Sequence, residues 1–314
     1  MIEVVIPAYN AGRFLREALN SVAAQTLRPA LVTVVDDAST DDTAAVARAG
    51  ADELRDRIAI QVLANTGPRG PSAARNTAIR QSKATWIAPL DADDVLAPGH
   101  HATLLRAVGA ADDAVLAFGD STTFREQQTL EASCLAKSGV TALPATEIAP
   151  ACWTLGDGMF AALLHNGVFG TSACLFRREA ASASGLFDET MMRSEDTDFF
   201  LRLVLAGRFV FSRDVVANKR VHDDNLSNAR HNLAFGHGTV RSLIKMTRLP
   251  GLSAGQSAAL QEALATALDG YLYGASRAGL PAYRQAVGLA REAGRPFIAA
   301  NPRHLARLAL HRVL

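Results

Sequence analysis

Short apolar strands that alternate with helix-like segments most constrain the fold of this chain. Four stretches are largely apolar and β-branched: Glu3–Ile6, Leu31–Val35, Ile58–Leu63 and Trp86–Leu90. A segment with helical character follows each of the first three. Strands in this arrangement favour a mostly parallel sheet with helices on both faces. We therefore expect an α/β fold whose ligands bind beyond the carboxyl ends of the strands.

Polar clusters follow all four of these strands. They are Tyr9-Asn10, Asp36-Asp37, the loop Asn65–Asn76 and Asp91–Asp94. Because the carboxyl ends of parallel strands meet at one edge of a sheet, these side chains should share the ligand-binding edge. We also expect Asn10 to cap the helix that follows it and Asp94 to cap the next turn.

The rest of the chain is first irregular and then helical. Residues 119–155 predict a variable excursion, and a strand is expected at Thr171–Phe176. Helical patterns then cover Asn228–Arg248, Ser253–Arg277, Pro281–Ala293 and Arg303–Val313. We expect one domain at residues 1–227 and an α-helical C-terminal region at residues 228–314.

The sequence shows no pattern typical of secretion or membrane insertion. MIEVVIPAYN enters a strand at once, without a basic and then apolar leader, and the long apolar stretch Met159–Phe176 is interrupted by polar residues. The cysteines are odd in number and lack metal-ligand spacing: Cys134, Cys152 and Cys174. We therefore expect a cytoplasmic protein with reduced cysteines.

Charge is divided unevenly along the chain. Residues 1–218 carry 19 Lys and Arg against 26 Asp and Glu, a balance of −7, whereas residues 219–314 carry 13 against 5, a balance of +8. The final segment PRHLARLALHRVL separates leucines from basic residues at helical spacing. This basic region is a candidate for peripheral contact with an anionic membrane at its inner face, or with an anionic acceptor. Packing on the first domain, or homo-oligomer formation, is the alternative, and no nucleic acid partner is expected.

Six sequence strings, in order and at similar spacing, resemble family-2 glycosyltransferases of the GT-A fold. They are VVIPAYN, VVDDASTDDT, GPSAARN, PLDADD, GLFDE…SEDTDFFLRL and RVHDDNLS. The similarity covers residues 1–227. It implies the GT-A nucleotide-diphospho-sugar transferase fold, with a nucleotide-binding half at residues 1–118, an acceptor and catalytic half at residues 119–227, and a helical C-terminal appendage.

The resemblance also implies an activity and a cofactor. Family members transfer a sugar from a nucleotide diphosphate donor to an acceptor hydroxyl, usually with inversion and with Mg²⁺ or Mn²⁺. We expect a UDP-sugar donor and a saccharide or lipid-linked acceptor, in polysaccharide or glycoconjugate biosynthesis. A hard cation bound by oxygen ligands neutralises the charge that develops on the departing diphosphate.

The metal site is assigned by resemblance to the acidic turn and a distant histidine. Asp93 would coordinate the cation, and Asp91 would contact the ribose or assist through water. An extended chain would place both carboxylates on one side. His222 corresponds to a histidine near the metal or diphosphate and is a candidate further ligand. A solvated acidic turn and an ordinary histidine are the alternatives.

The nucleotide is assigned to residues after the first three strands. By resemblance, Pro7-Ala8-Tyr9 and Asp37 bind the nucleotide. The ring of Tyr9 would pack near the base, and Asp37, with Asp36 as the alternative, would accept the imide N–H of uracil or thymine. Helix capping is the alternative for Asp37. Arg75 is assigned to phosphate oxygens, with a helix-surface ion pair as the alternative.

Glu195 and Asp196 match the acidic pair that supplies the general base in the family. Adjacent helical side chains diverge by about 100°, so only one of them can face the reaction centre. Asp196 shares a stripe with the apolar residues Phe199, Phe200 and Leu203, so we assign the base to Asp196 and acceptor contact or support to Glu195. The alternative is that both acids only stabilise the helix N-terminus through the helix dipole.

Three other functions use similar features. A phosphatase of the aspartyl-phosphate type also has two aspartates after a strand, but its motif continues with Gly-Thr, and here the pair follows the fourth strand. A sugar-phosphate nucleotidyltransferase shares the sheet and the metal, but PAYNAGRF is not a Gly-rich phosphate loop. A non-catalytic nucleotide-sugar binding module would have no need of both Asp93 and Asp196.

Overall fold

The structure is a computed structural model, which describes residues 1–314 apart from residues 166, 224, 226–230, 297–300 and 305–314. The chain divides into two compact units. Unit 1 comprises Met1–Thr190 and Arg202–His222, and unit 2 comprises Met191–Leu201 and Asp223–Leu314.

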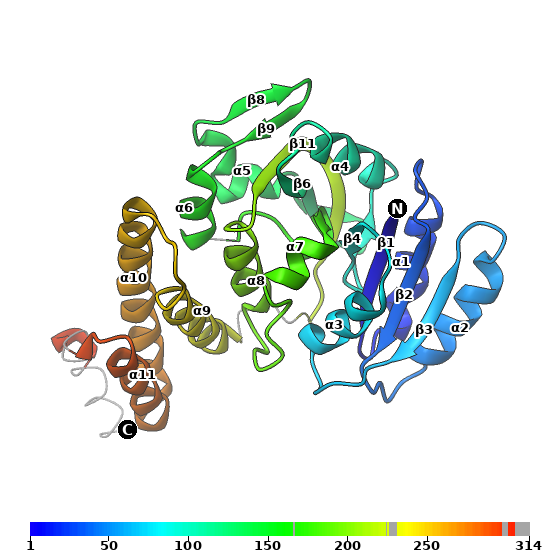
Figure 1. The fold of residues 1–314 in the computed structure, drawn as a ribbon. Helices are drawn as coiled ribbons and strands as arrows, with labels where there is room; N and C mark the ends of the chain where they lie inside the picture. The colour runs from blue at the N-terminus through cyan, green and yellow to red at the C-terminus, as the bar shows by residue number, and fades with distance from the viewer. Residues whose placement is uncertain (166, 224, 226–230, 297–300, 305–314) are drawn as a thin grey trace. The chain divides into compact units, whose positions relative to one another are not determined.

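Unit 1 is built on one sheet whose first half is parallel, as the sequence predicts (Figure 1). The order β3-β2-β1-β4 is formed by β1 (Ile2–Ala8), β2 (Leu31–Asp36), β3 (Ile60–Ala64) and β4 (Trp86–Pro89). Their carboxyl ends therefore lie at one edge of the sheet, which carries the four polar clusters.

The second half of the sheet is mixed. β10 (Cys174–Arg177) is antiparallel to both β4 and β6 (Ala114–Arg125), and β11 (Arg208–Arg220) is parallel to β6. β5 (Val95–Leu96) pairs with β11. The remaining strands are β7 (Gln128–Glu131), β8 (Thr146–Ala149) and β9 (Cys152–Thr154).

Two expectations for this half are corrected. The excursion expected at residues 119–155 contains the end of β6 and three further strands, whose alternating polar residues conceal them in the sequence. The strand expected at Thr171–Phe176 begins at Cys174, because Thr171–Ala173 forms a short 3₁₀ turn, η2.

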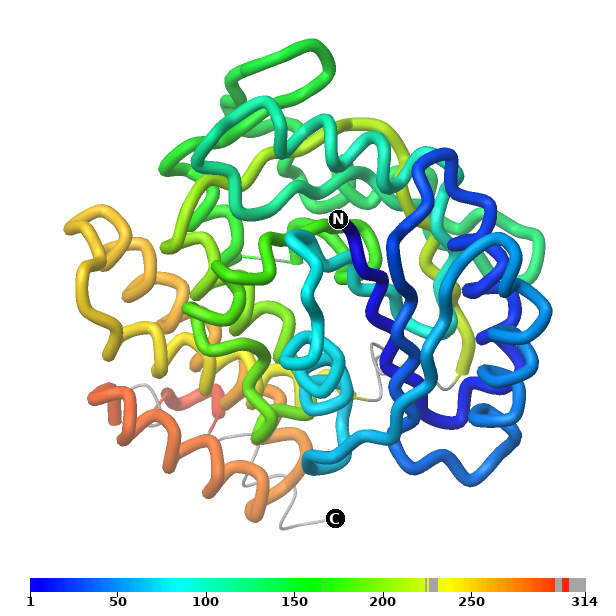
Figure 2. The backbone as a smooth tube through the Cα atoms, turned by 45° about the vertical axis from the view of Figure 1, so that its right-hand side comes forward, coloured from blue at the N-terminus to red at the C-terminus, as the bar shows by residue number. Residues whose placement is uncertain are grey.

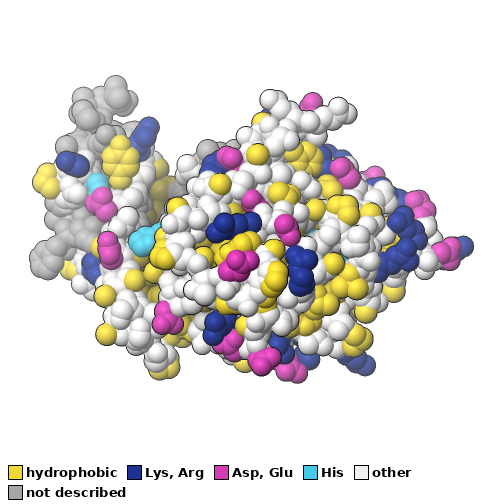
Figure 3. All heavy atoms as spheres, turned by 90° about the horizontal axis from the view of Figure 1, so that it is seen from above, with side chains coloured by type: hydrophobic (Ala, Val, Ile, Leu, Met, Phe, Trp, Pro, Cys, Tyr) yellow, Lys and Arg dark blue, Asp and Glu magenta, His cyan; other side chains and the backbone are white. Residues whose placement is uncertain are grey.

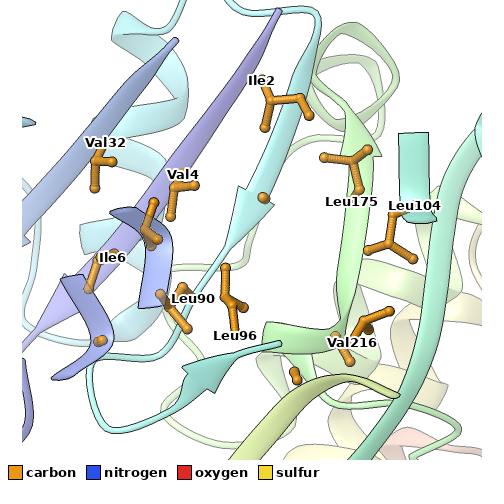
Figure 4. Packing of buried hydrophobic residues seen from close by; sticks show 14 of the residues in the cluster. Ile2, Val4, Ile6, Val32, Leu90, Leu96, Leu104, Leu175 and Val216 are labelled. Atoms are coloured by element: carbon orange, nitrogen blue, oxygen red, sulfur yellow. The ribbon is translucent and has the colours of Figure 1, made fainter. Parts of the chain in front are cut away.

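Helices cover the sheet on both faces. Val4 and Ile6 of β1 belong to a buried cluster with Leu15 and Leu19 of α1, whereas the intervening Val5 points to the opposite face. Figure 4 shows residues of this cluster spread across the sheet from Val32 of β2 to Val216 of β11. The principal helices of unit 1 are α1 (Gly12–Ala23), α2 (Thr43–Leu54), α3 (Pro71–Gln81), α4 (His100–Val108) and α6 (Gly158–His165). Shorter ones are α5 (Cys134–Ser138), η1 (Val140–Ala142) and α7 (Arg178–Ala183).

The expectation that Asn10 caps α1 is wrong. Asn10 has a φ of 48°, and its side-chain oxygen accepts the backbone N–H of Thr40 at 2.8 Å instead of a helical N–H. The backbone N–H groups at the start of α1 donate instead to two side chains that follow β2. Ala11 donates to Thr43, the first residue of α2, and Gly12 donates to Asp41 in the preceding turn. The two polar clusters after β1 and β2 thus hold each other in place.

Unit 2 is helical, in agreement with the pattern expected for the C-terminal region. α9 (Asn232–Met246), α10 (Ala254–Ala278) and α11 (Leu280–Glu292) follow one another, and α10 packs on both neighbours (Figure 2). Ser253 and Gln256 form a capping box at the start of α10. The helix expected at Arg303–Val313 lies almost entirely outside the described residues.

α8 (Glu195–Leu203) crosses the boundary between the units, and its first seven residues belong to unit 2. None of the described helices is long and apolar enough to cross a membrane. On the face drawn in Figure 3, acidic and basic side chains are interspersed among apolar ones.

Candidate functional site

The acidic motif lies on a tight turn between β4 and β5. The backbone N–H of Asp94 donates to the carbonyl of Asp91 at 3.0 Å, so the chain reverses here and is not extended. The expectation that Asp91 and Asp93 point to one side of an extended strand is therefore wrong. The two carboxylates instead have different partners, Arg75 for Asp91 and His222 for Asp93.

Asp93 and His222 form the centre of the candidate site. Oδ2 of Asp93 lies 2.9 Å from Nε2 of His222, and both side chains are partly buried. The other ring nitrogen of His222 is 3.3 Å from the guanidinium of Arg13, and its ring packs on Phe14. The structure thus brings together the two residues assigned to the cation.

Asp94 is a buried anchor and does not cap the turn, contrary to expectation. Its carboxyl group accepts the hydroxyl of Ser172 at 2.7 Å and the backbone N–H of Arg220 at 3.0 Å. Burial, together with the neighbouring Asp93 and Asp91, raises the pKa of Asp94 to about 8. Asp94 thereby fastens the acidic turn to η2 and to the end of β11.

Arg75 lies under the acidic turn. Its side chain is almost completely buried on α3, packs over the ring of Phe187, and donates to Asp91 at 2.7 Å. The arginine of this ion pair is therefore buried, whereas the alternative was an exposed pair on the helix surface. The planar guanidinium fixes the position of Asp91 at the sheet edge.

Asp37 connects the ends of β2 and β3. Its oxygens accept Nδ2 of Asn65 at 2.5 Å and the backbone N–H of Gly70 at 2.8 Å, and α2 is preceded by Asp42. Asp37 is therefore not a helix cap. Gly70 has a φ of 136°, a conformation that favours glycine, at the point where the loop enters α3.

Tyr9 is the exposed aromatic residue at this edge. Half of its surface is accessible, and the guanidinium of Arg69 lies 4.7 Å from its ring centroid. Pro7 is partly buried within β1, opposite Val35 of β2. A planar ring next to the Asp37 cluster is suited to pack against a base.

Glu195 and Asp196 begin α8 within unit 2. Both are partly exposed, and Asp196 accepts the backbone N–H of the next residue at 2.7 Å. Two residues later, Asp198 is fully buried and paired with Lys245 of α9 at 2.9 Å. Asp198 thus connects α8 to α9, a contact that sequence reasoning missed.

Sequence reasoning also missed Arg220, the last residue of β11. Its Nε donates to the backbone carbonyl of Asp93 at 3.0 Å. Its signal in the sequence is that it is the first residue of the string RVHDDNLS, but no role was assigned to this arginine.

The residues present fit a divalent cation that shares its coordination with a ligand. Asp93 offers a carboxylate and His222 an imidazole, and the described part of the chain contains no group of three or more His, Cys, Asp or Glu side chains placed to hold a metal. A site with two protein ligands suits Mg²⁺ or Mn²⁺ when phosphate oxygens and water fill the other positions.

Comparison with known proteins identifies the domain. The model of the family "Glycosyl transferase family 2" matches residues 3–153. Residues 3–153 thus match a family 2 glycosyltransferase domain. The matched segment contains the parallel half of the sheet, the acidic turn and Asp37, whereas His222 and Asp196 lie beyond it.

The chain also matches parts of two named relatives. The chain is 44% identical over 102 residues to the succinoglycan biosynthesis protein ExoU of Rhizobium meliloti, which is 32% of this chain and 29% of ExoU. It is 34% identical over 95 residues to the poly(ribitol-phosphate) β-N-acetylglucosaminyltransferase TarS of Staphylococcus aureus, covering 30% of this chain and 16% of TarS. Both matches thus span less than two thirds of the relative's length.

The fold is the GT-A fold. A structure of S. aureus TarS 1-349 in complex with UDP-GlcNAc superposes with a TM-score of 0.64 at 17% identity, over 99% of this chain and 91% of that one. The mannosyltransferase PcManGT of Pyrobaculum calidifontis, in complex with GDP-Man and Mn²⁺, has a TM-score of 0.61 at 20% identity, over 99% and 86%.

Proposed function

We propose that this chain transfers a sugar from a UDP-sugar to an acceptor hydroxyl, with inversion and with Mg²⁺ or Mn²⁺. The observation that carries the proposal is the contact between Asp93 and His222 at the edge where β1, β2 and β4 end. A carboxylate and an imidazole from distant segments converge there, beside the residues suited to a nucleotide. TarS, whose structure contains UDP-GlcNAc, is similar in fold.

The nucleoside would be held by the first three strand ends. Tyr9 offers the exposed ring for the base, and Asp37 is an acceptor for the imide N–H of uracil, next to Pro7 at the end of β1. Asn65 and Gly70 orient the Asp37 carboxylate before any ligand binds, which reduces the entropy lost on binding.

The diphosphate would lie beside Asp91 and the Asp93–His222 pair, with the buried Arg75 behind Asp91. Asp93 and His222 would hold the cation, which supplies Lewis-acid stabilisation of the charge on the leaving diphosphate. Arg75 holds the carboxylate of Asp91 through their 2.7 Å contact, so that Asp91 is oriented toward the ribose or a bridging water.

Asp196 is proposed as the general base, with Glu195 as acceptor contact or support. A carboxylate that is partly exposed at the start of a helix remains available to accept a proton from the attacking hydroxyl. A single displacement needs one such base and gives inversion of the anomeric configuration.

A panel of nucleotide sugars tests the function. UDP-sugars should bind in isothermal titration calorimetry with Mn²⁺ and lose affinity in EDTA, and turnover should release UDP. A sugar-phosphate nucleotidyltransferase would instead release pyrophosphate from a nucleoside triphosphate, and a non-catalytic module would bind the donor without release of UDP.

The acceptor is proposed to be a saccharide or a lipid-linked saccharide. ExoU is named as a succinoglycan biosynthesis protein, and the basic C-terminal region would favour an anionic acceptor or membrane surface. Sedimentation with anionic and neutral vesicles at low and high salt distinguishes a membrane contact from packing within the protein or between two copies.

A further inference from the structure

Arg220 forms hydrogen bonds with two consecutive residues of the acidic turn. Its side-chain Nε donates to the backbone carbonyl of Asp93 at 3.0 Å, and its own backbone N–H donates to Oδ1 of Asp94 at 3.0 Å. One residue at the end of β11 therefore fixes both the backbone and a side chain of the turn after β4. The same strand end leads directly to His222.

The guanidinium of Arg220 is itself held in place. It lies over the ring of Phe124 at 4.5 Å and over that of Phe14 at 5.1 Å, and it pairs with Glu17 of α1 at 2.5 Å. Only 11% of the side chain is exposed. Aromatic rings and an ion pair restrict the rotamers of a long side chain, so the Nε–H group is aimed at Asp93 before a ligand arrives.

We propose that Arg220 is a positioning residue for the cation site, and that it acts through the backbone carbonyl of Asp93. This inference rests on the proposed role of Asp93 as a cation ligand. The hydrogen bond holds the turn at the distance from β11 that lets the carboxylate of Asp93 reach His222. Without the bond, the turn would sample positions in which only one of the two ligands is in place.

Two substitutions of matched length isolate this hydrogen bond. In Arg220→Gln, the side-chain amide nitrogen occupies the place of Nε and keeps a donor toward Asp93. In Arg220→Met, a methyl group occupies that place and donates nothing. Both variants lose the positive charge and the ion pair with Glu17. The difference in Mn²⁺ affinity between the two variants therefore measures the contribution of the hydrogen bond to Asp93.

The measured quantity is the affinity for Mn²⁺ in the presence of saturating UDP. Binding is detected in electron paramagnetic resonance by the loss of the signal of free Mn²⁺. A net hydrogen bond contributes about 1 kcal/mol, so Arg220→Met should weaken Mn²⁺ binding about fivefold to tenfold. Arg220→Gln should remain within about threefold of the wild type. Arg106→Gln, an exposed arginine paired with Asp214, is the control and should leave affinity unchanged.

The outcomes separate this inference from the proposed function. Equal Mn²⁺ affinity of the Gln and Met variants overturns the positioning role while leaving the cation site intact. Absence of UDP-dependent Mn²⁺ binding in the wild type overturns both proposals. If Arg220→Met does not fold, Phe124→Leu removes the ring beneath the guanidinium and keeps every donor. It should weaken Mn²⁺ binding about twofold to threefold, and unchanged affinity would contradict the inference.

Discussion

Nε2 of His222 lies 2.9 Å from Oδ2 of Asp93, although 129 positions separate the two residues in the chain. The contact joins the end of β11 to the turn after β4. A cation bound to both residues must replace this contact, so the affinity for a cation depends on how firmly the two segments are already held together.

Nucleotide binding should depend on Asp93. In Asp93→Asn, the charge that offsets the cation is lost while the shape is nearly kept, so the affinity for UDP with Mn²⁺ should fall by at least tenfold. Calorimetry with UDP measures this, with Asp56→Asn, an exposed aspartate, as the control. Tight binding of UDP to the wild type in EDTA would refute a metal role for Asp93.

Asp196→Asn should bind the donor normally and lose most of the transfer. The amide cannot accept a proton, and loss of a general base typically lowers the rate by about 10²- to 10⁴-fold. Glu195→Gln is the matched variant and should retain more activity. Near-normal turnover in Asp196→Asn would move the base to another residue, with Glu195 tested first.

The product should have the opposite anomeric configuration to the donor. One base and no carboxylate assigned as a nucleophile favour a single displacement at the anomeric carbon. Proton NMR of the first-formed product gives the configuration through its anomeric coupling constant. Retention of configuration would require a different mechanism.

Unit 1 should lose stability in mild acid because of two adjacent buried histidines on α4. Burial and the neighbouring His101 lower the pKa of His100 to about 3, and burial lowers that of His101 to about 4, against a usual value of 6.5. The unfolded chain takes up protons first, so the free energy of unfolding is greatest above pH 6.5. It should fall by about 1.4 kcal/mol per pH unit for each histidine between about pH 6.5 and 4.

Urea unfolding at pH 7.5 and pH 5 tests this dependence. A His100→Asn/His101→Asn double variant should lose less stability between the two pH values than the wild type. His165→Asn, at an exposed histidine, should behave like the wild type. Equal stability of the wild type at both pH values would contradict the prediction.

The parallel half of the fold could be predicted because its information is local. Each strand from β1 to β4 is a short apolar run, and each polar cluster directly follows its strand, so the sheet edge follows from sequence order alone. The polar second half of β6 could not be recognised, since it is stabilised by pairing with β11, about ninety positions later.

The sequence indicated which residues gather at the candidate site, but it indicated few of the contacts that they make there. Asp93 and His222 were assigned to one cation, and they do meet. The partners of Asp94 and the role of Arg220 depend on how β11 lies against the acidic turn, which no local pattern specifies. Whether Asp196 serves as the base stays a prediction.

The position of β11 in the sheet has a consequence for the order in which the newly synthesised chain can fold. This strand pairs in parallel with β6 and carries Arg220, and His222 follows it directly. A chain emerging from the ribosome can form β1 to β4 early, but Asp93 and His222 cannot meet until residue 222 is available. The contact between the two residues therefore forms only after β11, the last strand of the described chain, has joined the sheet.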